Sequence, residues 1–397
     1  MPQAARSSQS GQSAAITLLP IMVAVLAGFL IIGLALPVLP LHVKNDLGFG
    51  TFVVGLVAGA QFAASLVSRV WAGSFSDKHG AKQGVIVGLI AAVMSGLLYL
   101  LSLAFINAPV LSVAFLLVGR AILGGAESFI ITAGVSWGLG LVDREHAGKV
   151  IAWVGTAMFA AMALGGPFGT TMFNSYGFAS IAVATVAFPF LVLIAILRMP
   201  AVAPLPPRAH SALKSVLGSV WLPGLGAATA SIGYCAILAF SSLFYSQQNW
   251  HPIWLAFTAF GVALIVARLI AGHLPDKFGG ARVALIFVLV QTGGLLLIWL
   301  SRNVMFASVG AAVAGFGYSL VYPGLGVEAV RGTAPENRGL AMGIYTAFLD
   351  VAMAVGSPVL GWIADHVGLG AVFLASAIVV FCTAGIAVRL MQRSVPA

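Results

Sequence analysis

Twelve long apolar stretches follow one another along the chain, with polar segments between them. Most of these stretches hold the roughly 20 apolar residues that a helix needs to cross a bilayer. The pattern predicts an all-α integral membrane protein with twelve transmembrane helices. The predicted spans are residues 15–41, 51–73, 84–106, 109–142, 149–173, 178–198, 216–247, 252–273, 283–301, 304–331, 340–364 and 368–390.

A Pro-rich, basic segment between the sixth and seventh spans divides the chain into two halves of six spans each. We expect this segment to be a cytoplasmic linker between two six-helix bundles. The expected parts are an N-terminal tail at 1–14, a first bundle at 15–198, the linker at 199–215, a second bundle at 216–391 and a C-terminal tail at 392–397.

Composition supports a membrane protein, because 60% of the 397 residues are hydrophobic and only 7% are charged. Soluble domains carry about 25% charged residues. The net charge is +9, and most of the Lys and Arg residues lie in alternate loops and at both termini, with Lys44 and Arg302 on the opposite side. This positive-inside bias predicts that both termini are cytoplasmic. The positive charge therefore reflects membrane topology and does not indicate a nucleic-acid partner.

The two halves share a sequence repeat. Residues 68–82 read SRVWAGSFSDKHGAK, and residues 267–282 read ARLIAGHLPDKFGGAR. Four residues recur 199 positions later: Arg69 as Arg268, Gly73 as Gly272, Asp77 as Asp276 and Lys78 as Lys277. Two six-span halves in the same orientation suggest bundles related by a pseudo-two-fold axis along the membrane normal.

Three charged residues, Arg120, Glu127 and Asp350, lie well inside predicted spans. A charge at the bilayer centre costs roughly 2.5–3.5 kcal/mol on insertion scales, so such residues are functional candidates. Arg120 and Glu127 are seven residues apart and share one helix face, about 10 Å apart along the axis, which is too far for a tight direct pair. We interpret the three residues as a proton-coupling polar site. The alternative is that they are buried groups that fix helix packing.

The repeated segment resembles the signature loop of the major facilitator superfamily, G-x-x-x-D-[RK]-x-G-[RK]-[RK], which follows span 2 and recurs after span 8. The matching residues are Gly73, Asp77, Lys78, Gly80 and Lys82 in the first half, with Ala81 in place of a basic residue, and Gly272, Asp276, Lys277, Gly279 and Arg282 in the second. The resemblance covers essentially the whole chain. Span 4 further resembles a bacterial inner-membrane branch, the YhhS-like or arabinose-efflux-like transporters, at Arg120, Gly124, Glu127, Ser128 and Trp137.

The resemblance implies alternating access by two six-helix bundles and a role for Arg120 in proton transfer. It also implies that the repeated segments, including Arg69 and Arg268, form a cytoplasmic gate. Asp77 and Asp276 would latch onto neighbouring helix starts, where backbone N–H groups favour an anion. A Gly-Pro cluster in span 5 loosely fits the exporter motif of the superfamily and has a counterpart in span 11. Its residues are Gly165, Gly166, Pro167, Gly169 and, in span 11, Pro358.

Polar and aromatic residues on several spans are candidates to line a substrate cavity, because Tyr and Trp can stack on a ring and form a hydrogen bond at one edge. The candidates are Gln61, Trp137, Tyr234, Tyr318 and Tyr322, with Trp254 as a further member.

The sequence therefore suggests a proton-coupled antiporter that exports a small organic solute, such as a sugar or an amphipathic drug, across the bacterial inner membrane. A symporter that imports a nutrient and a non-transporting membrane sensor are the alternatives. The chain carries no ATP-binding motif and no assembled catalytic set, so we expect no enzymatic activity, no cofactor and no metal. The expected partners are the solute, protons and the lipid bilayer, and the expected functional unit is a monomer.

Overall fold

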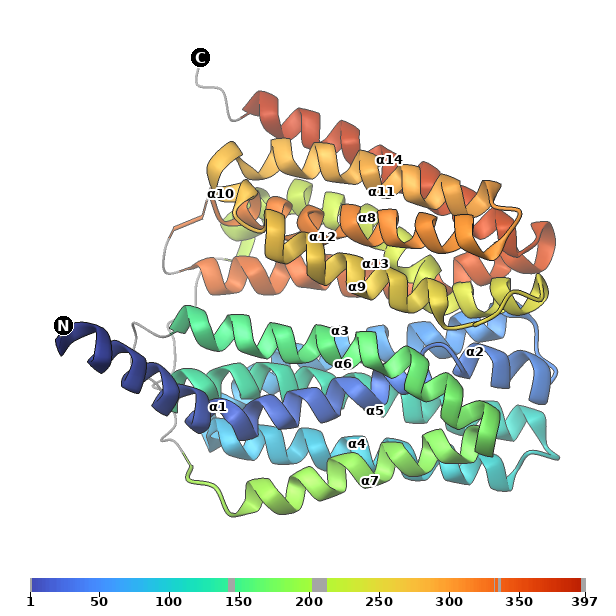
Figure 1. Cartoon of the computed structure of the whole chain (residues 1–397), viewed down its shortest axis with the longest axis horizontal. Helices are drawn as coiled ribbons and strands as arrows, with labels where there is room; N and C mark the ends of the chain where they lie inside the picture. Colours follow the sequence, from blue (N-terminus) through green and yellow to red (C-terminus); the bar gives the residue numbers. More distant parts are fainter. Residues whose placement is uncertain (1, 142–146, 202–212, 332, 335–336, 394–397) are drawn as a thin grey trace. The chain divides into compact units, whose positions relative to one another are not determined.

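The computed structural model describes residues 2–141, 147–201, 213–331, 333–334 and 337–393. These residues form α-helices, one short π-helical segment and no strand (Figure 1). Most of the predicted linker, residues 202–212, and the last four residues lie outside the described part. The elements are α1 (Pro2–Ala35), α2 (Leu39–Leu41), η1 (His42–Asp46), α3 (Thr51–His79), α4 (Ala81–Ala104), α5 (Pro109–Leu141), α6 (Ala147–Tyr176), α7 (Phe178–Leu197), α8 (Leu213–Gln247), α9 (Leu255–Ala271), α10 (Leu274–Phe278), α11 (Gly280–Leu300), α12 (Val304–Arg331), α13 (Arg338–Val367) and α14 (Leu369–Arg393).

The predicted all-α membrane class is confirmed, and each predicted span falls on a described helix. Within the described residues, ten helical segments are long and apolar enough to cross a membrane. Helix α9 has 17 residues and is shorter than these ten. It is shorter than the predicted span 252–273 because the helix breaks at Gly272 and His273, before Pro275 in the first turn of α10. Proline fits a first helical turn and not a helix interior.

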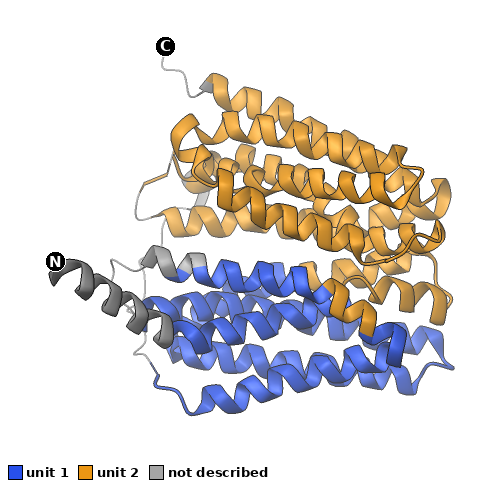
Figure 2. Ribbon diagram, viewed as in Figure 1, with its two compact units in different colours: residues 1–35, 64–165, 172–208 blue, residues 36–63, 166–171, 209–397 orange. Residues whose placement is uncertain are grey.

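The chain divides into two compact units (Figure 2). Unit 1 comprises residues 1–35, 64–165 and 172–208, and unit 2 comprises residues 36–63, 166–171 and 209–397. The N-terminal part of α3, residues 51–63, and residues 166–171 of α6 thus belong to the same unit as the C-terminal helices. The division at a linker between 199 and 215 stays a prediction.

In unit 1, α5 packs along α4, and α4 also packs against α7. Glycines bring these helices together. A Cβ atom added to Gly88 of α4 would lie 3.0 Å from the Ala126 carbonyl oxygen of α5, and one added to Gly96 would lie 2.7 Å from the Val186 backbone nitrogen of α7. Small residues at such crossings let helix backbones approach closely within a membrane.

In unit 2, α12 packs against α11, α9 and α8, and α8 also packs against α13 and α14. The α11–α12 contact again depends on glycine. A Cβ atom added to Gly310 would lie 2.8 Å from the Gly294 carbonyl oxygen, and one added to Gly324 would lie 2.8 Å from the Gly280 carbonyl oxygen. The core of unit 2 is therefore formed by helices whose backbones nearly touch.

Four helix–helix corners share one structure. Each ends in a glycine with positive φ, between 68° and 107°, whose N–H donates to the carbonyl four residues earlier. Only glycine adopts this backbone conformation without strain, which is why it ends helices so often. The corners are Asp77–Gly80, Asn174–Gly177, Asp276–Gly279 and Asp365–Gly368. Two of these corners are the repeated signature loops, and the other two follow α6 and α13, at the opposite ends of their units.

Candidate functional site

Arg120 is the most deeply buried charge in unit 1. It lies on α5 with no exposed surface, directly after Gly119, whose added Cβ atom would lie 2.9 Å from the Tyr99 ring of α4. Within the described residues, its Nε, Nη1 and Nη2 atoms have no hydrogen-bond partner. The spacing had predicted no tight pair with Glu127, and none is present. A buried guanidinium without a partner costs several kcal/mol.

Glu127 lies two helical turns further along α5, and its side chain is half-buried. Its neighbour Ser128 forms a hydrogen bond with Ser65 of α3, with 2.9 Å between the two hydroxyl oxygens. Arg69 donates from Nη2 to the same Ser65 oxygen at 3.3 Å. The Arg69 guanidinium therefore reaches the turn of α5 that carries Glu127.

Arg69 lies within α3 and not in the loop that follows it, and its role in a cytoplasmic gate stays a prediction. It precedes the last residue of α3, His79, by ten residues, which corresponds to about 15 Å along the helix. Its counterpart Arg268 lies within α9, ten residues before the end of α10. Both arginines are thus available to interior groups as well as to the loops.

Unit 2 brings together the three predicted tyrosines. Tyr234 of α8 and Tyr318 of α12 stack in parallel, with ring centroids 5.0 Å apart and 8° between the planes, and Phe260 of α9 lies 5.6 Å from Tyr234. The Tyr318 hydroxyl lies 3.1 Å from the Ser231 hydroxyl. This aromatic cluster is built from three helices and is the largest predicted group that the structure assembles.

Tyr322 extends the cluster towards α13. Its ring centroid lies 4.9 Å from that of Tyr345, which donates its hydroxyl hydrogen to the Tyr322 carbonyl oxygen at 2.6 Å. The Tyr322 hydroxyl lies 2.8 Å from the Thr346 hydroxyl. The hydroxyl groups of Tyr318, Tyr322 and Tyr345 are thus each oriented by a second side chain or by the backbone.

Charged side chains border this cluster. The Arg268 guanidinium interacts electrostatically with both Tyr318 and Tyr322. Asp350 of α13, only 2% exposed, interacts electrostatically with Tyr318. The structure therefore places the second predicted intramembrane carboxylate beside the predicted tyrosines, with one of the repeated arginines on the same cluster.

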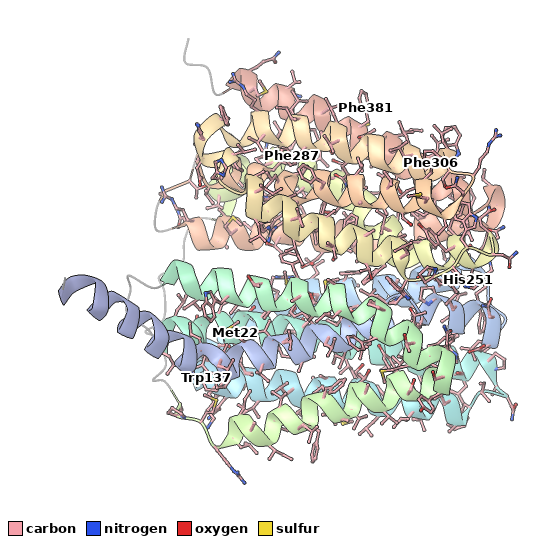
Figure 3. The ribbon with its side chains drawn as sticks, in the orientation of Figure 1. Met22, Trp137, His251, Phe287, Phe306 and Phe381 are labelled. Atoms are coloured by element: carbon pink, nitrogen blue, oxygen red, sulfur yellow. The ribbon has the colours of Figure 1, made fainter. Side chains whose placement is uncertain are left out.

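The other predicted cavity residues are on, or at the start of, three different helices. Trp137, labelled in Figure 3, is fully buried on α5 in unit 1, and its indole N–H has no partner among the described residues. Gln61 is buried on the part of α3 that belongs to unit 2. Trp254 is the N-cap residue of α9. Their lining of a common cavity stays a prediction.

Several cluster members were missed by the sequence analysis. They are small hydroxyl residues and rings at helical spacing from residues that were found: Ser65, Ser231, Phe260, Tyr345 and Thr346. Their spacing could have signalled them, since Ser231 precedes Tyr234 by three residues and Thr346 precedes Asp350 by four.

The signature loops hold two exposed acids, and one of their bases, Lys82, forms hydrogen bonds. Asp77 and Asp276 are exposed, and neither makes a hydrogen bond with another described residue. Lys82 instead donates to the carbonyl oxygens of Leu197 and Met199, which ties the start of α4 to the end of α7. The latching role of the two aspartates therefore stays a prediction.

The remaining signature residues are distributed along these corners. Gly80 and Gly279 are the positive-φ corners described above. A Cβ atom added to Gly73 would meet no described atom within 4 Å, and Gly272 is the C-cap of α9. Exposed side chains carry the rest of the charge: Lys78, Lys277 and Arg282.

A carboxylate that the sequence analysis did not single out does form a latch. Asp365, near the end of α13, accepts hydrogen bonds from the Thr51 N–H at 2.7 Å, the Phe52 N–H at 2.8 Å and the Thr51 hydroxyl at 2.6 Å. These are the first N–H groups of α3, which lack partners within their own helix. A Cβ atom added to Gly50 would lie 2.9 Å from the Asp365 carboxylate. Asp365 therefore caps α3 from a helix more than 300 positions away.

The Gly-Pro cluster of α6 forms close contacts on both sides. A Cβ atom on Gly165 would overlap the backbone of Gly33 in α1, and one on Gly166 would lie 2.7 Å from the Phe257 ring. Helix α6 continues through Pro167 without a break, and Gly169, two residues further along, is buried. In α13, Pro358 lies within a helix that packs closely on α3, since a Cβ atom on Gly59 would lie 3.3 Å from its Cδ atom.

No group of three His, Cys, Asp or Glu side chains within the described residues could hold a metal ion. Cys235 is buried and Cys382 exposed, and both are free thiols.

Comparisons with known proteins show to which family the chain is similar. The family model described as Major Facilitator Superfamily matches residues 21–256 and 246–397. An uncharacterized MFS-type transporter of Salmonella typhimurium is 37% identical over 381 residues, which cover 96% of this chain and 98% of that relative. The uncharacterized MFS-type transporter YhhS of Escherichia coli strain K12 is 37% identical over 372 residues, which cover 92% of this chain and 90% of YhhS.

Solved structures show the same fold at low identity. The crystal structure of a bacterial homolog to the human lysosomal transporter Spinster has a TM-score of 0.74 and 14% identity, over 95% of this chain and 97% of that one. A D-xylose-proton symporter has a TM-score of 0.73 and 15% identity, over 96% of this chain and 98% of that one.

Proposed function

Because the chain belongs to the major facilitator superfamily, we propose that this secondary transporter is a proton-coupled antiporter. It exports a small organic solute, such as a sugar or an amphipathic drug, by alternating access across the bacterial inner membrane, with both termini in the cytoplasm. Arg120, Glu127 and Asp350 are its coupling residues.

The observation that carries this proposal is the isolated guanidinium of Arg120. It is fully buried, and none of its three nitrogens has a hydrogen-bond partner among the described residues. A buried cation is tolerated when something neutralises it during part of the working cycle. Glu127, on the same face of α5, is the nearest acid along that helix.

Proton coupling follows if the surroundings of Glu127 change during the cycle. Approach of an arginine favours the ionised carboxylate, and burial away from an arginine favours the protonated one. Two states that bind the proton with different affinity are shifted by the proton gradient, and the solute is moved by that shift. Asp350 gives unit 2 a second carboxylate that can take part in the same way.

The aromatic cluster of unit 2 supports a ring-bearing solute. Tyr234, Tyr318 and Tyr322 offer ring faces and oriented hydroxyl groups beside Asp350 and Arg268. Aromatic faces pack on the apolar faces of rings, and hydroxyl groups bond their edges. A sugar and a planar drug both fit this chemistry.

A second candidate is proton-linked import. A D-xylose-proton symporter shares this fold with a TM-score of 0.73. The same fold therefore serves symport in at least one protein, and a buried carboxylate serves either direction.

The decisive experiment follows proton movement in inside-out membrane vesicles whose interior is acidified. Sugars, organic acids and cationic drugs are added one class at a time, and collapse of the pH gradient is recorded. The variants are Glu127→Gln and Asp350→Asn. The matched control is Asp46→Asn, a carboxylate at the end of the first candidate span whose side chain is 43% exposed. An empty-vector preparation sets the background.

Antiport predicts that one solute class collapses the gradient in the wild type and in Asp46→Asn, and not in Glu127→Gln. Collapse that survives Glu127→Gln and is lost in Asp350→Asn transfers the proton role to Asp350. Collapse that occurs only when the solute is loaded inside the vesicles means symport, and it contradicts export.

A further inference from the structure

A pocket at one end of unit 2 lies outside the coupling site. Its volume is about 440 Å³, and it is lined at the start of α11, the end of α12 and the end of α14. Its charged, polar and large apolar lining residues are Arg282, Arg331, Glu328, Phe278, Met391 and Gln392. The distribution of Lys and Arg predicts that this end faces the cytoplasm.

The pocket carries uncompensated positive charge. Its carboxylate, Glu328, is already engaged on both oxygens: Oε1 accepts the Ala281 N–H at 3.1 Å, and Oε2 accepts the Arg331 Nη1–H at 3.0 Å. Arg282 is exposed and makes no hydrogen bond or ion pair with another described residue. One guanidinium thus remains for an anionic ligand, and half of the Arg331 side-chain surface is still exposed beside it.

The neighbouring charges add to this excess. Lys277 lies beside the pocket, with its Nζ atom 5.4 Å from the centre of the Phe278 ring, and Arg389 is exposed on α14, three residues before Gln392. Among the described residues at this end of unit 2, the acid that is not already bonded is the exposed Asp276. An anion therefore enters a field that is positive overall.

The walls and surroundings of the pocket are apolar. Phe278, which lines the pocket, is 49% exposed. Along α11, Ile286 and Leu289 follow Arg282 at intervals of four and three residues, and both are exposed. This spacing places them on the helix face that carries Arg282. An exposed apolar stripe therefore begins directly at the free arginine.

Helix α14, which packs beside α11, carries a second stripe (Figure 1). Ile378, Phe381 and Val388 are 59%, 56% and 41% exposed, and Gln392 of the pocket continues the same face. Gly385 lies within this stripe, and a Cβ atom on it would meet no described atom within 4 Å. Phe381 is labelled on α14 in Figure 3. Both stripes thus lead away from one basic pocket.

We propose that this pocket binds the phosphate headgroup of an anionic phospholipid whose acyl chains lie along the exposed faces of α11 and α14. Arginine suits phosphate because its planar guanidinium can donate two parallel hydrogen bonds. Basic pockets between helices at the cytoplasmic surface have the charge and depth that such headgroups need. The polar end and the apolar stripes match the two parts of one lipid molecule, which a free phosphate ion does not.

The test measures lipid binding to the purified, delipidated full chain by native mass spectrometry. Phosphatidylglycerol and phosphatidylcholine with the same acyl chains are titrated in parallel. The first variant is Arg282→Gln, which breaks no described contact. The second is Arg282→Gln combined with Arg331→Gln. The matched control is Arg302→Gln, which removes an exposed arginine at the other end of α11.

We expect phosphatidylglycerol affinity to fall roughly fivefold for each arginine removed from the pocket. Arg302→Gln should bind as the wild type does, and phosphatidylcholine binding should not change in any variant. Thermal unfolding in the same detergent shows whether the double variant is folded, and Arg282→Gln alone decides the question if it is not. A third titration uses inorganic phosphate, which should displace phosphatidylglycerol only weakly.

Equal phosphatidylglycerol affinity in Arg282→Gln and the wild type overturns the proposal. An equal loss in Arg302→Gln overturns it too, since the effect would then follow net charge alone. If millimolar inorganic phosphate displaces phosphatidylglycerol completely, the pocket is an anion site and not a lipid site.

Discussion

The contact between Asp365 and the start of α3 makes a quantitative prediction. One carboxylate accepts two backbone N–H groups and one hydroxyl, at 2.6–2.8 Å. Both backbone donors precede the first intrahelical bond of α3, which runs from the Val54 N–H to the Gly50 carbonyl oxygen. Asp365 is therefore the acceptor that keeps these two amides protected from solvent.

The substitution Asp365→Asn removes the negative charge and one of the two acceptor oxygens, and it keeps the size of the side chain. Asparagine retains one oxygen for Thr51, whose two bonds become neutral, and places an NH2 group opposite the Phe52 N–H, so the charge-assisted bond to Phe52 is lost. Hydrogen bonds to charged groups are worth about 1.5–3 kcal/mol, which is roughly 10- to 150-fold in an opening equilibrium. The Phe52 amide should exchange its hydrogen faster by this factor.

Hydrogen-exchange mass spectrometry of peptides that contain residues 47–58 measures this change. Thr51→Val removes the hydroxyl donor and leaves both backbone donors in place, so its effect should be smaller. The matched control is Asp276→Asn, which also lies three residues before a positive-φ glycine and whose carboxylate bonds no other described residue. It should leave exchange at 47–58 unchanged.

Two results would refute this reasoning. Unchanged exchange at residues 47–58 in Asp365→Asn would show that the carboxylate does not hold α3. An equal increase in Asp276→Asn would show that loss of any corner carboxylate loosens the whole bundle. In a transporter that works by alternating access, a contact of this kind must form and break, so Asp365→Asn should also change the transport rate.

Two further substitutions test packing and the aromatic cluster. Gly165→Val places a side chain against the backbone of α1 and should lower stability by about 1–3 kcal/mol, seen as a lower melting temperature, whereas Gly155→Val on the same helix has open space and should not. Tyr318→Phe removes the hydroxyl that pairs with Ser231 and should raise the KM for the solute about fivefold, since a neutral hydrogen bond is worth about 1 kcal/mol. Tyr176→Phe, at a residue that is 78% exposed, should leave KM unchanged.

The helices could be predicted because their signal is local. A run of apolar residues long enough to span a bilayer is helical wherever it lies in the fold, since the backbone must satisfy its own hydrogen bonds there. The prediction erred at residues 252–273 because Gly272 and Pro275 act over one turn, which hydropathy does not register. The broken end of α9 was therefore included in the span.

The four corners were only half recognised. The two signature loops share an Asp-Lys pair and were found, whereas the corners at Asn174–Gly177 and Asp365–Gly368 keep only the spacing of a polar residue three positions before glycine. The backbone needs only the glycine, so the other positions are free to change. A search for the spacing, without the charges, would have found all four.

The role of Asp365 could not be predicted from sequence. Its partners lie 313 and 314 positions away, and no local pattern distinguishes it from Asp77 or Asp276. The three tyrosines were predictable because polar aromatic residues are conspicuous in apolar spans. Ser231 and Thr346 gave a weaker signal, which was only their spacing of three and four residues from Tyr234 and Asp350, because serine and threonine also satisfy their own helix backbone.

The repeated arginines show how the two halves diverged on a shared backbone. Arg69 and Arg268 occupy the same position relative to their glycine corners, 199 residues apart. Arg69 donates to Ser65, which is bonded to Ser128 beside Glu127, whereas Arg268 interacts with Tyr318 and Tyr322. One half surrounds its arginine with small hydroxyl groups and a carboxylate, and the other surrounds it with aromatic rings. This difference fits the proposal that Glu127 of unit 1 is a coupling residue and that the tyrosines of unit 2 contact the rings of the solute.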